Sequence, residues 1–291
     1  NIDLTSEVVK EYPSLQGHAG GFYAKNVGFP KDVQDAFSEQ YKISIFRKEV
    51  DLTIILSLAQ KVDSIFSFFS SKKKISGSGD PFGIRRISIS LIKILIENKL
   101  DLDIFKIFNC CQKLNLEQQI QSFSDVELII NFLNKRIEVF FLDEGYKAEV
   151  IKSCLNLKSF NPYFISSKIV NLTKFLTTAK GKNFMKAFKR LNSIADNTKS
   201  NYELDHSLLK KKEEIELFEI IKNFKTNKKN RPSGIDEVSY EKISCAINNF
   251  LDNIMVNAEE KELRINRKLL LFECKNVLSS FFNFSILQID D

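Results

Sequence analysis

Apolar residues recur at three- and four-residue steps along most of this 291-residue chain, and this spacing constrains the fold more than any other feature. Residues at such steps share one face of an α-helix, because the helix has about 3.6 residues per turn. Only five Pro and ten Gly interrupt these patterns. The clearest stripe lies within residues 52–69 and consists of Leu52, Ile55, Leu56, Ala59, Val62, Ile65, Phe66 and Phe69. The sequence therefore predicts an all-α protein.

One segment is ambiguous, because residues 87–92, ISISLI, alternate as a β-strand would. The apolar run nevertheless continues without a break as far as Glu97, which favours a buried helix. Asp80 and Pro81 precede it, and both suit a helix start. An Asp at the N-cap accepts a backbone N–H, and a Pro at the first helical position loses no donor that the helix needs. We therefore expect a helix that begins at Pro81.

Three glycines close together mark a turn near the beginning of the chain. Pro13 disfavours helical geometry in Tyr12, so the first helix should end there. Gly17, Gly20 and Gly21 follow, and glycine permits positive φ or the close approach of two backbones. A phosphate-binding loop would need a preceding strand or a P-loop lysine, and the sequence has neither in this region. A tight helix–loop–helix turn is the better interpretation.

The net charge and the cysteines limit the kinds of partner, metal site and compartment that the chain can have. A formal net charge of +6 favours a polyanionic partner, although the same Lys, Asn and Ile excess is typical of AT-rich coding sequences. Five cysteines without a CxxC spacing predict neither a zinc site nor a disulfide framework, which fits a reducing cytoplasm. We expect no apolar run of transmembrane length. Because the chain begins at Asn1 without an initiator Met, we expect it to be a fragment.

Basic residues gather on two predicted helices, each beside an apolar stripe. Such faces suit contacts with phosphate, although a solvated face is the ordinary alternative. Residues 70–80 form a Ser, Gly and Lys loop whose lysine run is a further candidate, and we expect at least one arginine of the pair at 85–86 to make a structural ion pair. The candidate nucleic-acid contacts are Arg264, Arg267, Lys268, Lys186, Lys189, Arg190, Arg85, Arg86 and Lys73.

Several segments resemble one known family, in the same order and spacing. Residues 11–24, 80–86, 132–146 and 255–271 resemble segments of the bacterial glycyl-tRNA synthetase beta subunit. The last of them resembles the C-terminal anticodon-binding region of that family, which is a DALR-type helical module. The resemblance implies an HD-like helical domain over residues 1–110, followed by linker helices and a DALR-type anticodon-binding bundle over residues 111–291.

The resemblance also implies a function. This chain would be the tRNA(Gly)-binding C-terminal part of a cytoplasmic glycine–tRNA ligase subunit, with no membrane contact. A separate catalytic alpha subunit would carry out the ATP-dependent attachment of glycine in an α2β2 assembly. ATP and Mg²⁺ would then bind the alpha subunit, and this chain would hold no cofactor, no metal and no catalytic residue.

Two positions depart from the pattern of HD-type domains. Gln40 and Gln60 stand where the pattern has His and Asp, and a neutral amide is a poor metal ligand. The sequence contains only two histidines, His18 and His206, far apart. We therefore expect no metal and disfavour an HD-type phosphohydrolase. That enzyme and a non-catalytic helical RNA-binding adaptor remain the two alternative functions.

Overall fold

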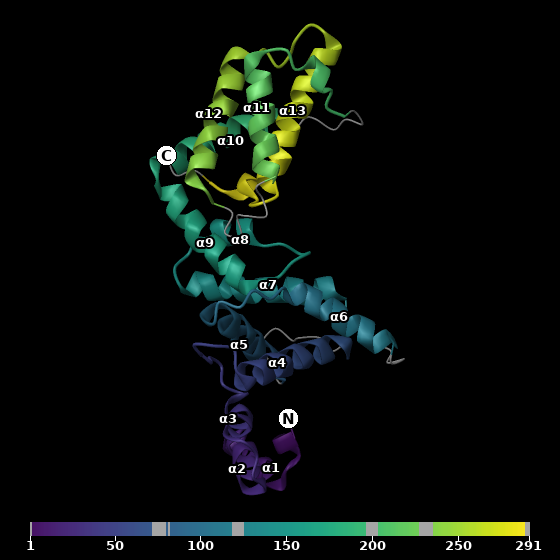
Figure 1. The fold of residues 1–291 in the computed structure, drawn as a ribbon, viewed down its shortest axis with the longest axis vertical. Coiled ribbons are helices and arrows are strands. Elements are labelled where there is room, and N and C mark those ends of the chain that lie inside the picture. The colour runs from purple at the N-terminus through teal and green to yellow at the C-terminus, as the bar shows by residue number, and fades with distance from the viewer. Residues whose placement is uncertain are drawn as a thin grey trace. The chain divides into compact units, whose positions relative to one another are not determined.

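The computed structural model describes residues 2–71, 80, 82–117, 125–195, 203–226 and 235–288 (Figure 1). Within these ranges every regular element is a helix and no strand occurs, which confirms the all-α prediction. The chain forms two compact units. Unit 1 consists of residues 1–144 and 156–163, and unit 2 consists of residues 145–155 and 164–291.

Unit 1 is built around α4 (Leu52–Ser70), which packs against the neighbouring helices α3, α5, α6 and α7. Val62, Ile65 and Phe66 of the predicted stripe are buried, whereas Leu52 and Ile55 at its start are exposed and Ile54 is buried in their place. The other helices of this unit are η1 (Ile2–Thr5), α1 (Glu7–Glu11), η2 (Pro13–Leu15), α2 (His18–Val27), α3 (Lys31–Glu39), α5 (Ile84–Glu97), α6 (Ile104–Glu117) and α7 (Val126–Asp143).

By length and composition alone, α4 could cross a membrane. It has 19 residues, and its most apolar window has a mean hydropathy of 1.4. The expectation that no apolar run reaches transmembrane length is therefore wrong for this helix. A core helix passes the same test, and Ile54, Ile65 and Phe66 of α4 are buried where it packs against the neighbouring helices.

The glycine-rich turn brings α2 against α3. Gly17 has a φ of 85° and precedes α2, while a Cβ at Gly21 would clash with the hydroxyl of Ser38 on α3. The turn is fixed from the N-terminus, because the buried carboxylate of Asp3 accepts the Gly17 N–H at 2.7 Å and the Tyr41 hydroxyl at 2.8 Å. Both properties expected of these glycines, positive φ and close approach, are confirmed.

Residues 84–97 form a helix, so the helical interpretation of the ISISLI segment is confirmed. Its predicted start is wrong, because α5 begins at Ile84 after Gly83, whose φ is 64°. Asp80 still caps the first turn of α5, since its Oδ2 accepts the backbone N–H of Arg85 at 3.1 Å. Pro81 lies outside the described residues.

Helix α6 runs through residues 110 and 111, where the family resemblance implies a boundary between two domains. Phe108 on this helix is fully buried and stacks on Phe66 of α4 at 6.1 Å between ring centroids. Just before α6, Asp103 accepts the backbone N–H of Phe160 at 3.0 Å. These contacts explain why α6 and residues 156–163 belong to unit 1.

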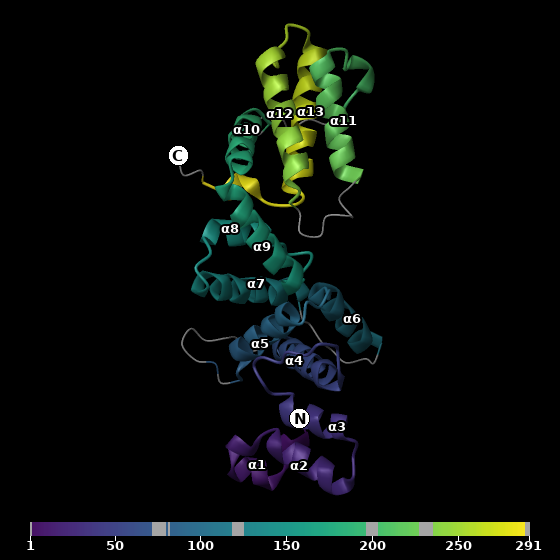
Figure 2. The same ribbon diagram turned by 60° about the vertical axis from the view of Figure 1, so that its left-hand side comes forward.

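Unit 2 is a bundle in which α10, α11, α12 and α13 pack side by side (Figure 2). Its core is aromatic: the Tyr240 ring lies 4.9 Å from Phe184, 5.2 Å from Phe224 and 5.4 Å from Phe175, between centroids. Each aromatic pair of this kind stabilises the fold by about 0.5–1.5 kcal/mol beyond the contribution of the apolar area that it buries. The helices in or entering this unit are α8 (Ala148–Cys154), α9 (Pro162–Thr177), α10 (Ala179–Ala195), η3 (His206–Leu208), α11 (Lys212–Thr226), α12 (Glu237–Asn253), α13 (Lys261–Ser279) and η5 (Phe284–Ile286).

Candidate nucleic-acid interface

The basic residues predicted on one helix all lie on α13, but they do not share one environment. Arg264 and Lys268 are half-buried with part of each side chain in solvent, whereas Arg267 is only 8% exposed. The Nε of Arg267 donates to Oε1 of Glu214 at 2.7 Å, and its Nη1 donates to the Met255 carbonyl at 3.0 Å. The prediction that Arg267 is part of an exposed basic face is therefore wrong.

The position of Arg267 follows from the helical step. Leu263, Arg267, Leu270 and Cys274 are separated by four, three and four residues, so Arg267 lies on the apolar stripe itself. Leu270 and Cys274 are fully buried. A charge on such a stripe needs a partner, because burying an unpaired charge is costly. Glu214, which is 1% exposed, supplies it.

Glu214 also organises the chain before α11. Its Oε2 accepts the backbone N–H groups of Lys210 and Lys211, each at 3.0 Å. Lys211 stands at the N-cap, where its own side chain cannot accept, so Glu214 acts as the reciprocal half of a capping box. The side chain of Asn266, next to Arg267 on α13, exchanges two hydrogen bonds of 2.8 and 2.9 Å with the backbone of Asp205. The segment 205–211 is thus fixed against α13.

Three consecutive lysines are held at the end of this segment, and all three are exposed. The sequence of this segment is typical of a polar connection, which by itself indicates no role for these lysines. Helices α11 and α13 lie side by side in both views (Figures 1 and 2), and the buried Glu214–Arg267 pair joins them. The α11–α13 cationic surface, as we name it, consists of Lys210, Lys211, Lys212, Arg264 and Lys268.

The second predicted basic face lies on α10. Lys186 and Lys189 are exposed, and neither pairs with a carboxylate among the described residues. Arg190 is engaged by α12, since Nη2 donates to Asp252 at 2.6 Å and Nη1 donates to Asn248 at 2.8 Å. The charge of Arg190 is therefore partly offset within the bundle, and the two lysines carry this face.

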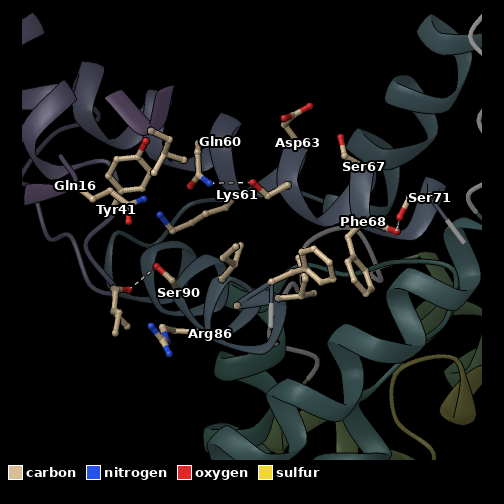
Figure 3. A pocket seen from close by; sticks show the side chains of 17 residues that line it. Gln16, Tyr41, Gln60, Lys61, Asp63, Ser67, Phe68, Ser71, Arg86 and Ser90 are labelled. Atoms are coloured by element: carbon tan, nitrogen blue, oxygen red, sulfur yellow. Dashed lines mark hydrogen bonds between the residues drawn. The ribbon is translucent and has the colours of Figure 1, made fainter. Parts of the chain in front are cut away.

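The remaining candidates belong to unit 1. Arg85 is half-buried and Arg86 is exposed, as expected for neighbours that point about 100° apart on a helix. Arg86 lines a cavity beside α4 (Figure 3). Lys73 lies outside the described residues, so its predicted contact stays a prediction.

The two glutamines that stand in place of the expected His and Asp make protein contacts. The Gln40 amide donates to the Phe37 carbonyl at 3.2 Å, and the Gln60 amide donates to Ser64 Oγ at 2.9 Å. In the described part of the chain, no three His, Cys, Asp or Glu residues are grouped so that they could hold a metal ion. The donors that this chain presents at these positions do not suit a divalent metal.

Comparison with known proteins agrees with the sequence resemblance. The family described as glycyl-tRNA synthetase beta subunit matches residues 1–156. The glycine–tRNA ligase beta subunit of Thermodesulfovibrio yellowstonii is 33% identical over 97% of this chain, and that of Aquifex aeolicus is 29% identical over 100% of it. In both cases the chain covers 42% of the relative's length. This chain belongs to the glycyl-tRNA synthetase beta subunit family.

Proposed function

We propose that this chain is a tRNA-binding part of a cytoplasmic glycine–tRNA ligase beta subunit. In this proposal a separate alpha subunit attaches glycine to tRNA(Gly) with ATP and Mg²⁺, and the two kinds of subunit form an α2β2 assembly. Family membership supports the enzyme, and the α11–α13 cationic surface supports the role of this part. The HD-like and DALR-type assignments belong to the same proposal.

The α11–α13 cationic surface carries the proposal because it combines exposed charge with a fixed backbone. Lys210, Lys211 and Lys212 present three charges to solvent on a segment whose N–H groups are bonded to a buried carboxylate. Phosphate contacts position an RNA without reading its sequence. They contribute most to affinity when the protein segment that makes them is already ordered, because no entropy is then lost in ordering it. The lysines of α10, Lys186 and Lys189, extend the positive charge of the same bundle.

In this function Arg267 is a positioning residue and makes no direct RNA contact. It holds Glu214, which holds the lysine segment, and it also holds the carbonyl of Met255 in the turn between α12 and α13. Arg264 and Lys268 flank it and reach solvent. The surface therefore acts by placing tRNA, and the bond-forming chemistry takes place on the alpha subunit.

The experiment measures tRNA(Gly) binding by fluorescence anisotropy between about 50 and about 200 mM KCl. One variant changes Lys210, Lys211 and Lys212 to Gln, and the control changes the exposed Lys174, Lys222 and Lys242 to Gln. Each phosphate contact adds about −0.7 to the slope of log K against log salt for single strands, so three contacts amount to a change of about 2. The control should leave the slope nearly unchanged.

A second assay separates tRNA binding from assembly. With the alpha subunit added, the lysine variant should raise the KM for tRNA in aminoacylation and leave ATP–pyrophosphate exchange unchanged. A slope equal to that of the control variant would refute the interface and favour a helical adaptor without an RNA role here. If exchange and charging decrease together, the lysines act through subunit assembly, and the proposed role is wrong.

A further inference from the structure

Unit 1 contains a cavity of about 610 Å³ beside the polar face of α4 (Figure 3). Cavities of about 300–1,000 Å³ are typical of sites for small molecules. Both α4 and α5 contribute to its wall, with Lys61 and Phe68 from α4 and Arg86 from α5. Gln60, which stands at one of the two expected metal positions, also lines the cavity. The cationic surface of the proposed function lies in unit 2 and does not include it.

Lys61 is an unusual residue for such a wall, because its side chain is only 2% exposed. Its Nζ donates to the Gln40 carbonyl at 2.9 Å and to the Ser57 hydroxyl at 2.6 Å, and both acceptors are neutral. Burial alone lowers the pKa of Lys61 to about 8, and no carboxylate offsets it. An ammonium carries three N–H donors, so one remains without a protein acceptor among the described residues.

A buried ammonium without a counter-charge is a costly arrangement. The cost is relieved when an anion reaches the third donor, because a charge-assisted hydrogen bond then replaces the missing solvation. Arg86 lines the same cavity, is exposed and makes no ion pair within the described ranges. A guanidinium can bind two oxygens of one phosphate at once. Lys61 and Arg86 therefore present two positive charges to one cavity.

The distribution of groups around the cavity is uneven. In Figure 3, Lys61, Arg86 and Ser90 lie toward one end and Phe68 toward the other. Among the described residues of the wall, Asp63 is the only acid, and its carboxylate points away from the end where Lys61 and Arg86 lie. The positive end is thus not neutralised by the cavity itself.

The opposite end is aromatic. The Phe68 and Phe82 rings are 5.6 Å apart between centroids and inclined by 54°, and Phe82 is 51% exposed. An exposed aromatic ring stacks on any nucleobase, because every base has a π-face. Lys61 and Phe68 are seven residues apart on α4, which corresponds to about 10 Å along a helix. A phosphate at one end and a base at the other would span this length.

We propose that this cavity binds a nucleotide, with its phosphate at Lys61 and Arg86 and its base against Phe68 and Phe82. The nucleotide is either free or an unpaired residue of an RNA strand, since both present the same phosphate and base. Binding is non-covalent, and no bond of the ligand is broken. The site lies in unit 1 and does not depend on the cationic surface proposed above.

Calorimetric titration of the whole chain at neutral pH tests the site with AMP, adenosine and inorganic phosphate. AMP should bind more tightly than either of its parts. Arg86→Gln and Lys61→Met should each weaken AMP binding at least tenfold, while Lys48→Gln, an exposed lysine of the same unit outside the cavity, should not. Phe82→Ala should weaken AMP binding and leave phosphate binding unchanged. Since Arg86 is exposed, its variant keeps the test valid if Lys61→Met disturbs the fold.

Three results would overturn the proposal. Failure of AMP to bind removes the whole site. AMP binding that Arg86→Gln and Lys61→Met leave intact removes the phosphate end. Phosphate that binds as tightly as AMP removes the base end. A trinucleotide titrated in parallel identifies the source of the ligand. Tenfold tighter binding than AMP supports a nucleotide within RNA, and binding equal to AMP supports a free nucleotide.

Discussion

The buried pair between Glu214 and Arg267 gives the sharpest test of how unit 2 is held together. Arg267→Met keeps most of the apolar stem and removes the charge, so Glu214 is left buried without its counter-charge. Breaking a buried pair in this way costs about 3–5 kcal/mol. Two backbone N–H groups still bond to Glu214, and the first turn of a helix favours a carboxylate. We therefore expect the lower end of that range, about 3 kcal/mol.

The matched control is Arg190→Met, which removes an arginine from another ion pair of the same bundle. The side chains of Arg190 and Asp252 are 45% and 59% exposed, and pairs in solvent contribute about 0–1 kcal/mol. Urea denaturation followed by circular dichroism compares the two variants. In the Arg267→Met background, Glu214→Gln should recover part of the loss, because the unpaired charge is then gone. A loss for Arg267→Met no larger than that for Arg190→Met would refute the reasoning.

Two further changes probe unit 1. Gly21→Ala should destabilise it by about 1–3 kcal/mol, because the new Cβ clashes with Ser38 Oγ. Gly20→Ala should lower the free energy of unfolding far less, because its Cβ would meet no atom nearer than 3.5 Å. Thermal denaturation of the two variants compares their stabilities. Lys61 gives a pH dependence, because burial lowers its pKa to about 8 from the ordinary lysine value of 10.5. The unfolded chain binds more protons between these values, so stability should rise with pH from about 8 to about 10.5, by about 3 kcal/mol in total. The other titratable groups of the same cavity wall are Tyr41, Asp63 and Arg86. Lys61→Met should abolish this rise, and a rise that persists in the variant would show that another group causes it.

The sequence predicts the helices well because their apolar spacing is local information. The sequence also indicates that Arg267 is buried, since the spacing from Leu263 to Leu270 places its charge on an apolar stripe. Such a charge predicts a buried partner, although the spacing alone does not identify it. The start of α5 was mispredicted for another reason. Gly83 adopts a positive φ, so Asp80 reaches the first turn from three residues before the N-cap.

The cationic surface and the cavity could not be predicted in the same way. The lysines at 210–212 read as part of a polar connection until the structure shows that Glu214 and Arg267 fix them. Lys61 stands on a polar position of α4, where an exposed lysine is the ordinary expectation. Its burial depends on Gln40 and Ser57, and the contact with Gln40 comes from a different part of unit 1. Both features depend on tertiary contacts, and these cannot be inferred from the spacing of residues along one helix.

The bonds that fix the lysine segment also decide when it becomes ordered. Arg267 and Glu214 are 53 residues apart in the chain, and Asn266 and Asp205 are 61 apart. Contacts of such long sequence separation form late, because the loop they close must lose its entropy first. We therefore expect the segment 205–211 to take its final form only after α13 has docked. Its amide hydrogens at Asp205, Lys210 and Lys211 should exchange with solvent at the rate at which α13 opens, so this segment and α13 should behave as one cooperative unit.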